Sequence, residues 1–485
     1  MTVDNQDSGS PAMRFEILKA LKDGAAARVG RLAFAGRLPI DTPNFIAITS
    51  RGAVPHITPD NAEKHLKTTG AYMALEDFIE RPQQYLKRTP PIYQASTTPK
   101  HPTRLHSFTA TPPSVTTILS ARRLPAVPAP MGNTTNAVSV FTSTGFQSLT
   151  TTEYHSAVEA LRPDIAIPLA DLTHTTTTPN SKRALRMAER TDEWTVEWFS
   201  ALSNSNVSTF APVLPIPYSI QWEYISRLAE DYLPTGQLAG LALYDADVLP
   251  DLESHSPSLL PLPRLAFTNP PTPHHILRQI SLGIDLFTLP FLNQISDAGL
   301  ALSFTFPAPP DSKDMPGPQP LAIDLSHPTH ATSLLPLSPT TTNCACYACT
   351  SHHRAYIHHL LHAREMLGWT LLQIHNHAVI SSFFAGVRAT IAEGGADALE
   401  QATKRFATVY EADFPEGMAE RPRARGYQFK SVGGGEGKRN KPAWGKLGGN
   451  EDGNGEGKTE ERGGEEEDGI VKAVEEMAVE EKEGR

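Results

Sequence analysis

Strand-like and helix-like segments alternate along most of this chain, and that alternation constrains the fold more than any other feature of the sequence. Short apolar or β-branched runs typical of buried strands occur at residues 45–49, 137–142, 164–170, 207–214, 238–244, 284–291 and 300–306. Helical patterns lie between several of them, as where Met187, Trp194 and Trp198 share one helical face. The alternation predicts a parallel α/β fold, and both a (β/α)8 barrel and a doubly wound sheet fit it. No Gly-rich phosphate loop follows the early strands, which disfavours a dinucleotide-binding sheet.

The two ends of the chain and two internal stretches differ from the rest in composition. Residues 431–485 hold 15 acidic side chains, 9 basic side chains and 14 of the 33 glycines, so they can bury little apolar surface to offset the entropy of ordering. We therefore expect a disordered N-terminus over 1–13, a folded body over 14–430 and a disordered acidic Gly/Glu-rich tail over 431–485. Residues 96–136 and 307–343, rich in proline, serine or threonine, are expected to be low-complexity insertions without regular structure.

Charge and cysteine content exclude several classes of protein. The 43 basic and 53 acidic residues give a formal net charge of −10, which argues against a surface built for non-specific nucleic-acid binding. Three cysteines are too few for a disulfide scaffold. No apolar stretch approaches the ~18 residues of a membrane-spanning helix, and the polar N-terminus does not resemble a signal peptide. The sequence thus predicts a soluble intracellular protein.

All three cysteines lie within six residues, as Cys344, Cys346 and Cys349. This spacing lets three thiolates converge on one soft cation from a single tight loop, and Zn²⁺ requires a fourth nitrogen or sulfur ligand. A redox Cys-x-x-Cys pair is the alternative, but the third thiol favours a metal. Six histidines lie close in sequence to the cluster or to His375: His352, His353, His358, His359, His362 and His377. Spacing alone leaves the choice of the fourth ligand open among these and His375, which lies on the apolar side of a predicted helix that could break at Gly368.

Several segments together resemble the tRNA-guanine transglycosylase family. The most specific is the cysteine cluster followed by Tyr-Ile-x-His-Leu-Leu from Tyr356 and by Ile-His-Asn from Ile374. The other matching segments are residues 41–45, 52–58, 143–147, 239–242 and 283–287. The resemblance implies a (β/α)8 TIM barrel with a zinc-binding subdomain around 340–390. It also implies that His375 joins the three cysteines around one structural Zn²⁺ per subunit, with no open position for a catalytic water.

This sequence departs from the family pattern at the positions that carry the family's catalysis and its recognition of the base and of tRNA. Family members exchange a tRNA base with one aspartate as nucleophile and a second carboxylate for proton transfer. The matching positions here hold Thr288 and Thr142, and we therefore predict no catalytic residues. The family residue that reads guanine aligns with Ala170, although Asp171 is adjacent. The basic run that contacts tRNA in the family is replaced by residues 291–297.

A family barrel that keeps its zinc motif and lacks its carboxylates is expected to be a non-catalytic subunit. The resemblance implies a heterodimer with a catalytic queuine tRNA-ribosyltransferase subunit, acting on the wobble position of tRNAs with GUN anticodons. Cytoplasmic location follows, with peripheral attachment to the mitochondrial outer membrane as an alternative. An independently active enzyme using Asp285 or Asp297 and a stand-alone tRNA-binding scaffold are the competing hypotheses. Basic clusters that could contact RNA occur at residues 122–123, 182–186 and 421–425.

Overall fold

The computed structural model describes residues 13–21, 26–79, 89–129, 132–143, 145–174, 178–203, 205–309, 317–338 and 344–415. The tail predicted over 431–485 lies outside these residues, as does all of the predicted N-terminal segment except Met13. Among the described residues, no helix is long and apolar enough to cross a membrane.

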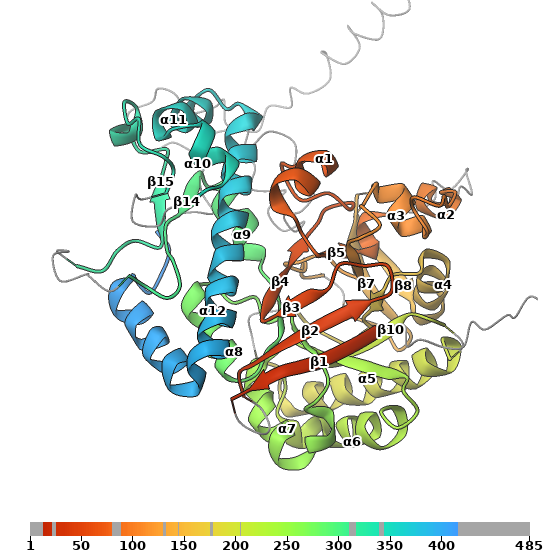
Figure 1. The fold of residues 1–485 in the computed structure, drawn as a ribbon. Coiled ribbons are helices and arrows are strands. Elements are labelled where there is room, and N and C mark those ends of the chain that lie inside the picture. The colour runs from red at the N-terminus through yellow and green to blue at the C-terminus, as the bar shows by residue number, and fades with distance from the viewer. Residues whose placement is uncertain are drawn as a thin grey trace, which may run out of the picture. The chain divides into compact units, whose positions relative to one another are not determined.

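Eight parallel strands close into a barrel, which confirms the predicted fold class (Figure 1). Their order around the barrel is β4, β5, β6, β9, β10, β11, β12 and β13. They span Asn44–Ile48, Gly70–Ala74, Thr116–Ser120, Ile165–Ala166, Ser208–Val213, Leu238–Leu243, Arg264–Ala266 and Leu286–Thr288. Large apolar side chains such as Ile46, Ile118 and Phe210 are buried together in one of the apolar clusters of the barrel strands. The C-terminal ends of the eight strands form one rim, which we call the barrel mouth and where barrel enzymes place their active sites.

Five of the seven predicted strands overlap barrel strands β4, β9, β10, β11 and β13. The other two lie outside the barrel. β7 (Ala137–Thr142) pairs with β8 (Gly145–Thr150) in an antiparallel hairpin, and β14 (Leu300–Leu302) pairs with β15 (Ala322–Asp324). An apolar run shows that a strand is buried and does not show which partner it has.

The stretch 96–136 is not an unstructured insertion, because it supplies barrel strand β6 and helix α3 (Arg104–Thr109). All five residues of β6 are buried, although three of them are threonine or serine. Their burial comes from pairing with β5 and β9, which composition cannot show. The stretch 307–343 likewise contains β15 and a short 3-10 turn, η6 (Pro328–His330), so the expectation of no regular structure is wrong there too.

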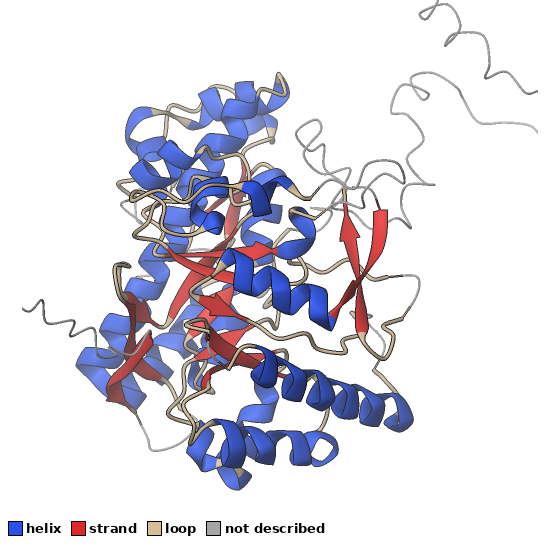
Figure 2. Ribbon diagram, turned by 90° about the vertical axis from the view of Figure 1, so that its right-hand side faces the viewer, coloured by secondary structure: helices blue, strands red, loops and turns tan. Residues whose placement is uncertain are grey.

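Helices surround the barrel in the positions that the alternation predicted (Figure 2). α4 begins with a capping box in which the Thr150 and Glu153 side chains each bond the other residue's backbone N–H. The predicted helical face of α5 is buried against the barrel at Met187, Trp194 and Trp198. The main covering helices are α4 (Thr151–Leu161), α5 (Ser181–Ala201), α6 (Tyr218–Arg227), α7 (Leu249–His255), α8 (Pro273–Ser281) and α9 (Pro290–Asp297). Shorter helices are α1 (Pro59–Asn61), η1 (Ala62–Leu66), η2 (Leu75–Asp77), α2 (Pro91–Gln94), η3 (Leu228–Tyr232), η4 (Ala246–Val248) and η5 (Pro257–Leu259).

An antiparallel sheet of β1 (Met13–Ala20), β2 (Arg28–Phe34) and β3 (Ile40–Thr42) precedes the barrel. After the barrel come β14, β15, η6, α10 (Tyr347–Ser351), α11 (Arg354–His362) and the long helical run α12 (Met366–Val409), which is interrupted at Gly395. We call the part from β14 to the start of α12 the metal lobe. The chain reverses between α11 and α12 at Arg364, whose φ is 57°, and not at Gly368 as expected, because Gly368 lies inside α12.

Candidate metal centre and barrel mouth

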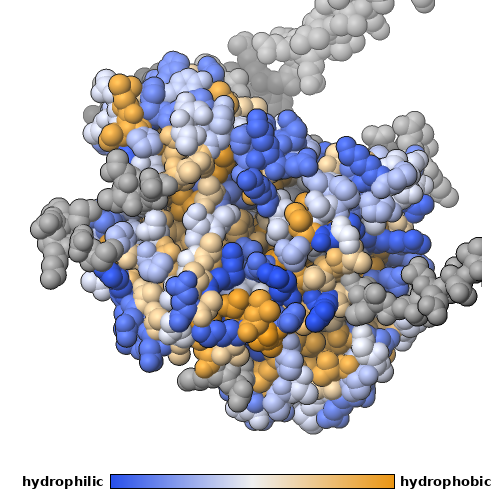
Figure 3. Space-filling model, viewed as in Figure 1, coloured by the Kyte–Doolittle hydropathy of each residue, from blue (hydrophilic) through white to orange (hydrophobic). Residues whose placement is uncertain are grey.

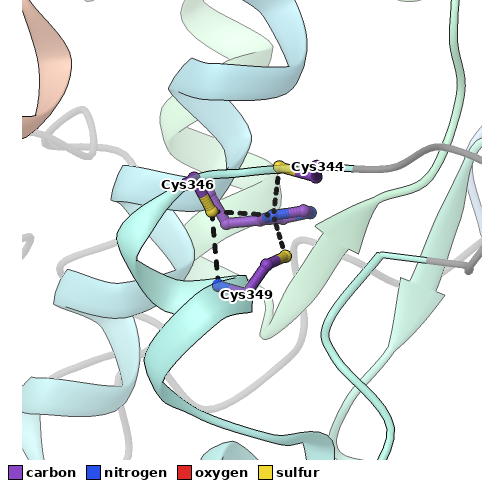
Figure 4. Close-up of side chains that lie close together, drawn as sticks. Cys344, Cys346 and Cys349 are labelled. Carbon is purple, nitrogen blue, oxygen red and sulfur yellow. Dashed lines mark hydrogen bonds between the residues drawn. The ribbon is translucent and has the colours of Figure 1, made fainter.

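The structure brings Cys344, Cys346, Cys349 and His375 together, with one potential ligand atom from each lying within 4.8 Å of the others. His375 Nδ1 lies 3.8, 3.6 and 3.3 Å from the sulfurs of Cys344, Cys346 and Cys349 respectively. A tetrahedral zinc ion with its usual bond lengths holds a sulfur and a nitrogen about 3.6 Å apart. The observed separations bracket that value, so the four atoms already have the spacing of a Cys3His site (Figure 4).

Local structure holds each ligand in position. Cys346 is the N-cap of α10, where its sulfur accepts a hydrogen bond from the Cys349 backbone N–H at 3.4 Å. His375 comes from α12 and is fully buried, and its Nε2 bonds the Leu302 carbonyl of β14 at 2.8 Å. Because a carbonyl only accepts, Nε2 carries a proton, which leaves Nδ1 as the nitrogen that would bind a metal. This second contact is typical of a metal-binding histidine.

The electrostatics of the cluster favour a bound cation. Hydrogen bonds from the Cys346 and Cys349 thiols lower the pKa of Cys344, whereas the hydrogen bond with Cys344 raises the pKa of Cys346. Burial lowers the pKa of His375, but the sulfurs of Cys344 and Cys349 outweigh it and raise that pKa to about 9. Three sulfurs at this spacing cannot all ionise without a positive charge between them, and a divalent metal supplies that charge.

The other candidate fourth ligands lie apart from the cluster. Among the described residues, no further histidine joins the group of possible metal ligands. His377 is two residues beyond His375 and faces Gln373, with 3.2 Å between the two side-chain nitrogens. The residues present therefore fit one closed Cys3His site, while their role as ligands remains a prediction developed below.

Thr288 is the last residue of β13 and so stands at the barrel mouth. Its side chain is buried, and its hydroxyl donates a hydrogen bond to the Ala266 carbonyl of β12 at 2.9 Å. Thr142 ends β7, where its hydroxyl donates to the Gly145 carbonyl at 2.9 Å and accepts from the Gln147 amide at 2.7 Å. Both hydroxyls thus make hydrogen bonds within or between strands.

Asp285 precedes β13 and lies at the opposite end of the barrel from the mouth. It is fully buried, and its two carboxylate oxygens accept hydrogen bonds from Arg28 Nε at 2.8 Å and Nη2 at 2.6 Å. The Arg264 backbone N–H donates a third, at 2.9 Å. The Arg264 side chain is also buried, and burial together with the nearby Arg28 lowers its pKa to about 10. Asp285 therefore balances buried positive charge, and its environment is that of a structural residue.

Asp297 is the last residue of α9, and its side chain also has a partner within the fold. Its Oδ1 lies 2.6 Å from His56 Nε2, and its backbone carbonyl accepts a hydrogen bond from the Trp369 indole at 3.0 Å. These contacts tie the loop after β4 to α9 and to the first turn of α12. Neither Asp285 nor Asp297 ends a barrel strand, which is where a nucleophile of this fold would be placed.

Asp171, adjacent to the family's base-reading position, is held by two arginines. The Arg183 guanidinium contacts both oxygens at 2.8 and 2.6 Å, Arg190 adds a bond of 2.6 Å and the Asn133 amide one of 2.8 Å. In the same way, Arg123 bonds Glu76 at 2.9 Å. Two members of the predicted basic clusters thus form ion pairs within the fold, and residues 421–425 lie outside the described residues.

Aromatic side chains fill the barrel mouth. Tyr244 stacks on Phe267 with ring centroids 5.2 Å apart, and Tyr72 packs against Phe267 at 5.6 Å. The cavity that they line together with Arg122 and His174 measures about 30 Å³. This is roughly the volume of one water molecule in the liquid, whereas small-molecule sites usually offer about 300–1,000 Å³.

The sequence analysis missed two features that the structure makes plain. The first is the buried cluster in which the Arg28 side chain and the Arg264 backbone N–H bind Asp285. The second is the pair formed by His56 and Asp297. Arg28 begins β2 and is buried like Val29 and Gly30 after it. Its partner is 257 residues away, which no local pattern reveals.

A closed parallel barrel with a Cys3His lobe at its C-terminal side defines the class of this protein. A sequence model of the family described as queuine tRNA-ribosyltransferase matches residues 23–412. The chain is 33% identical over 432 residues to the queuine tRNA-ribosyltransferase accessory subunit 2 of Schizosaccharomyces pombe, covering 88% of this chain and 91% of that protein. Proteins of the same name from Ixodes scapularis and Xenopus laevis are 27% and 25% identical, each covering 80% of this chain and 99% of the relative. The chain belongs to the queuine tRNA-ribosyltransferase family, the tRNA-guanine transglycosylases.

Proposed function

We propose that this protein is the non-catalytic subunit of a heterodimeric queuine tRNA-ribosyltransferase. In that complex it supports the exchange of guanine for queuine at the wobble position of tRNAs with GUN anticodons. The observation that carries the proposal is the pair of threonines at the family's two carboxylate positions. Thr142 and Thr288 hydrogen-bond within the fold, and a threonine hydroxyl is a far weaker nucleophile than an ionised carboxylate at neutral pH.

The barrel mouth supports the same proposal. The cavity between Tyr244 and Phe267, at about 30 Å³, is far smaller than the ~300–1,000 Å³ of usual small-molecule sites. The two aspartates that could replace the missing nucleophile are bonded elsewhere, Asp285 to Arg28 and Asp297 to His56. Relatives covering most of this chain carry the name accessory subunit 2, which agrees with a barrel that has lost its chemistry.

We assign one structural zinc ion to Cys344, Cys346, Cys349 and His375. Four protein ligands leave no coordination position for substrate or water, so the ion would act on folding and not on the reaction. It would hold α10 against β14 and α12, because the ligands come from the loop before α10, from α10 itself and from α12, and His375 also bonds Leu302.

The metal lobe also offers a surface for the catalytic partner. Five of the eleven large apolar side chains exposed among the described residues lie there or at the start of α12: Leu334, Leu335, Tyr347, Met366 and Leu367. Leu334 is 77% exposed, although its loop is held by hydrogen bonds from the Arg354 and Ala355 backbone N–H groups to Leu335 and Ser333. Figure 3 shows apolar surface on this lobe. A fixed apolar projection suits a protein interface better than solvent.

Reconstitution tests the function. Labelled queuine incorporation into tRNA is measured with this chain alone, with a catalytic family member alone and with the mixture. We expect incorporation that depends on the mixture. Incorporation by this chain alone would refute the non-catalytic role and return attention to Asp285 and Asp297. Tight tRNA binding by this chain without any effect on the partner's activity would favour the scaffold hypothesis.

A second experiment tests the partner surface. Leu334→Asp should abolish co-purification with the catalytic subunit while leaving the melting temperature of this chain unchanged. Leu185→Asp is the matched control, because Leu185 is also an exposed leucine, at 49%, but lies on α5, outside the metal lobe. Equal loss of the complex with both variants would contradict the assignment. Location in the cytoplasm or on the mitochondrial surface stays a prediction, which fractionation of tagged protein can test.

A further inference from the structure

A cavity of about 460 Å³ opens on the metal lobe, separate from the Cys3His cluster. It is bounded by the end of α9, the β15–η6 segment, α11 and the turn into α12. Its polar lining comprises Asp297, Asp324, His327, His358, His362 and Arg364 together with Ser326. Trp369 and Leu361 supply apolar wall. Three histidines thus stand around one opening, and none of the four residues of the Cys3His cluster lines it.

Two of these histidines are placed as a chelating pair. His358 and His362 are four residues apart on α11, so their side chains lie on the same face one helical turn apart. Their rings are nearly parallel, with an interplanar angle of 17° and centroids 6.3 Å apart. Two imidazoles at this spacing on a helix can bind one metal ion from the same side, as in metal sites that use a His-x-x-x-His segment.

One ring nitrogen of His358 is already held by a contact within the fold. Its Nδ1 lies 3.0 Å from the Leu325 carbonyl, which can only accept a hydrogen bond. Nδ1 therefore carries a proton, which leaves Nε2 as the nitrogen that would bind a metal. Metal-binding histidines commonly have such a carbonyl contact on the nitrogen that does not bind the metal. His375 of the Cys3His cluster makes the equivalent contact with Leu302.

The charge of the lining favours a cation over an anion. Apart from the histidines, the carboxylates of Asp297 and Asp324 and the guanidinium of Arg364 sum to a formal charge of −1. An anion would meet that negative charge, whereas a divalent cation would be attracted by it. Imidazole nitrogens select transition metals such as Zn²⁺ or Co²⁺, and the hard cations Mg²⁺ and Ca²⁺ prefer oxygen ligands.

We propose that His358 and His362 bind a second divalent transition metal ion in this cavity. No third ligand atom lies close enough to complete a preformed group among the described residues, so the remaining positions would be filled by water. A shift of the exposed His327 or of Asp324 would allow either to replace one water. The site would therefore be open and exchangeable, unlike the closed Cys3His centre, and would link α11 to the β15–η6 segment.

Metal stoichiometry of the full chain tests the proposal. Protein equilibrated with micromolar Zn²⁺ in excess Mg²⁺, which occupies weak carboxylate sites, is desalted only briefly before metal analysis. We expect two zinc ions per chain. Co²⁺ titration separates the sites, because the thiolate-bound ion gives intense sulfur-to-metal charge-transfer bands and the histidine-bound ion does not. One zinc ion per chain in the wild-type protein would overturn the proposal.

Variants identify the residues involved. His362→Ala, at an exposed position, and His358→Ala should each reduce the content from two ions to one and remove only the cobalt phase without charge transfer. His359→Ala is the matched control, since His359 lies on the same helix but does not line the cavity and should keep two ions. Two ions retained by both the His358 and the His362 variants would place the second metal elsewhere. Residues 416–485 contain neither histidine nor cysteine and therefore offer no competing imidazole or thiolate ligand.

Discussion

Replacing Asp285 with asparagine distinguishes a structural carboxylate from a displaced catalytic one. Asp285 and Arg28 are 0% and 4% exposed, and the carboxylate accepts two hydrogen bonds from the Arg28 side chain. Asp285→Asn keeps the shape of the side chain and removes its charge. The variant would leave the Arg28 guanidinium buried beside Arg264 with no anion between them.

The expected loss is large because the positive charge cannot reach water. Removing one partner of a buried ion pair typically costs about 3–5 kcal/mol, since the remaining charge stays desolvated. Arg28 keeps its hydrogen bonds to the Leu260 and Leu262 carbonyls, which anchor it in place and prevent escape. We therefore expect Asp285→Asn to lower the free energy of unfolding by roughly 3–5 kcal/mol.

Urea unfolding followed by tryptophan fluorescence measures this loss. Asp41→Asn is the matched control, because Asp41 pairs with Arg31 at 2.7 Å on the surface, with both side chains nearly half exposed. An exposed pair contributes about 0–1 kcal/mol, so the control should unfold close to wild type. An Asp285→Asn protein within about 1 kcal/mol of wild type would refute the structural reasoning. If this chain alone did modify tRNA, and Asp285→Asn abolished that activity without lowering stability, the result would instead support Asp285 as a nucleophile.

Four further changes have defined outcomes. Cys346→Ser should remove the metal of the Cys3His centre and lower the free energy of unfolding by several kcal/mol, because metal-binding free energy is also folding free energy; metal analysis and urea unfolding measure this. Thr142→Ala combined with Thr288→Ala should leave tRNA modification by the mixed subunits near wild type and cost about 1 kcal/mol per lost hydrogen bond, as seen in activity and unfolding assays. Ala110→Gly should raise the free energy of unfolding by about 0.5–1 kcal/mol, because Ala110 has a φ of 53° and a Cβ atom is strained there. Burial lowers the pKa of His174 to about 3, so the neutral ring is favoured in the folded state and stability is lost as the pH falls below about 6.5. Between pH 6.5 and 4.5, wild type should lose up to roughly 2 kcal/mol more than His174→Asn.

For each of these four changes, one result would contradict the expectation. Full metal content in the Cys346 variant would mean that another residue completes the site. Abolished chemistry in the double threonine variant, with the heterodimer intact, would contradict the non-catalytic role. A less stable Ala110→Gly protein would show that loss of chain entropy outweighs relief of strain. Parallel pH profiles for wild type and the His174 variant would mean that His174 has the same pKa in the folded and the unfolded chain.

The sequence was informative where a local pattern carries the structure. The spacing of Met187, Trp194 and Trp198 predicted the buried face of α5, and the cysteine spacing predicted three sulfurs converging on one point. Both follow from helix geometry or a tight loop and require no knowledge of distant segments.

Features that depend on contacts between residues far apart in the chain could not be predicted in this way. Strand β6 consists of Thr-Thr-Ile-Leu-Ser within a proline-rich stretch, and only its neighbours β5 and β9 make it a buried strand. The role of Asp285 depends on Arg28, far away in the chain. His375 could be assigned to the cluster only through a family resemblance, because the reversal at Arg364 that allows α12 to return toward the cysteines has no glycine or proline to mark it.

Helix α12 makes the metal lobe and the barrel inseparable. One stretch of it carries His375, and the next few turns bury Phe383, Phe384 and Val387 in the main apolar core. Further along, the Arg388 side chain donates to the Pro43 carbonyl at 2.8 Å, just before the first barrel strand. If the chain ended after β13, the apolar side chains that pack against Phe383, Phe384 and Val387 would lose this cover and face water. Evolution could erase the active site of such a protein residue by residue, but it could not discard the metal lobe without exposing the core that the lobe's own helix completes.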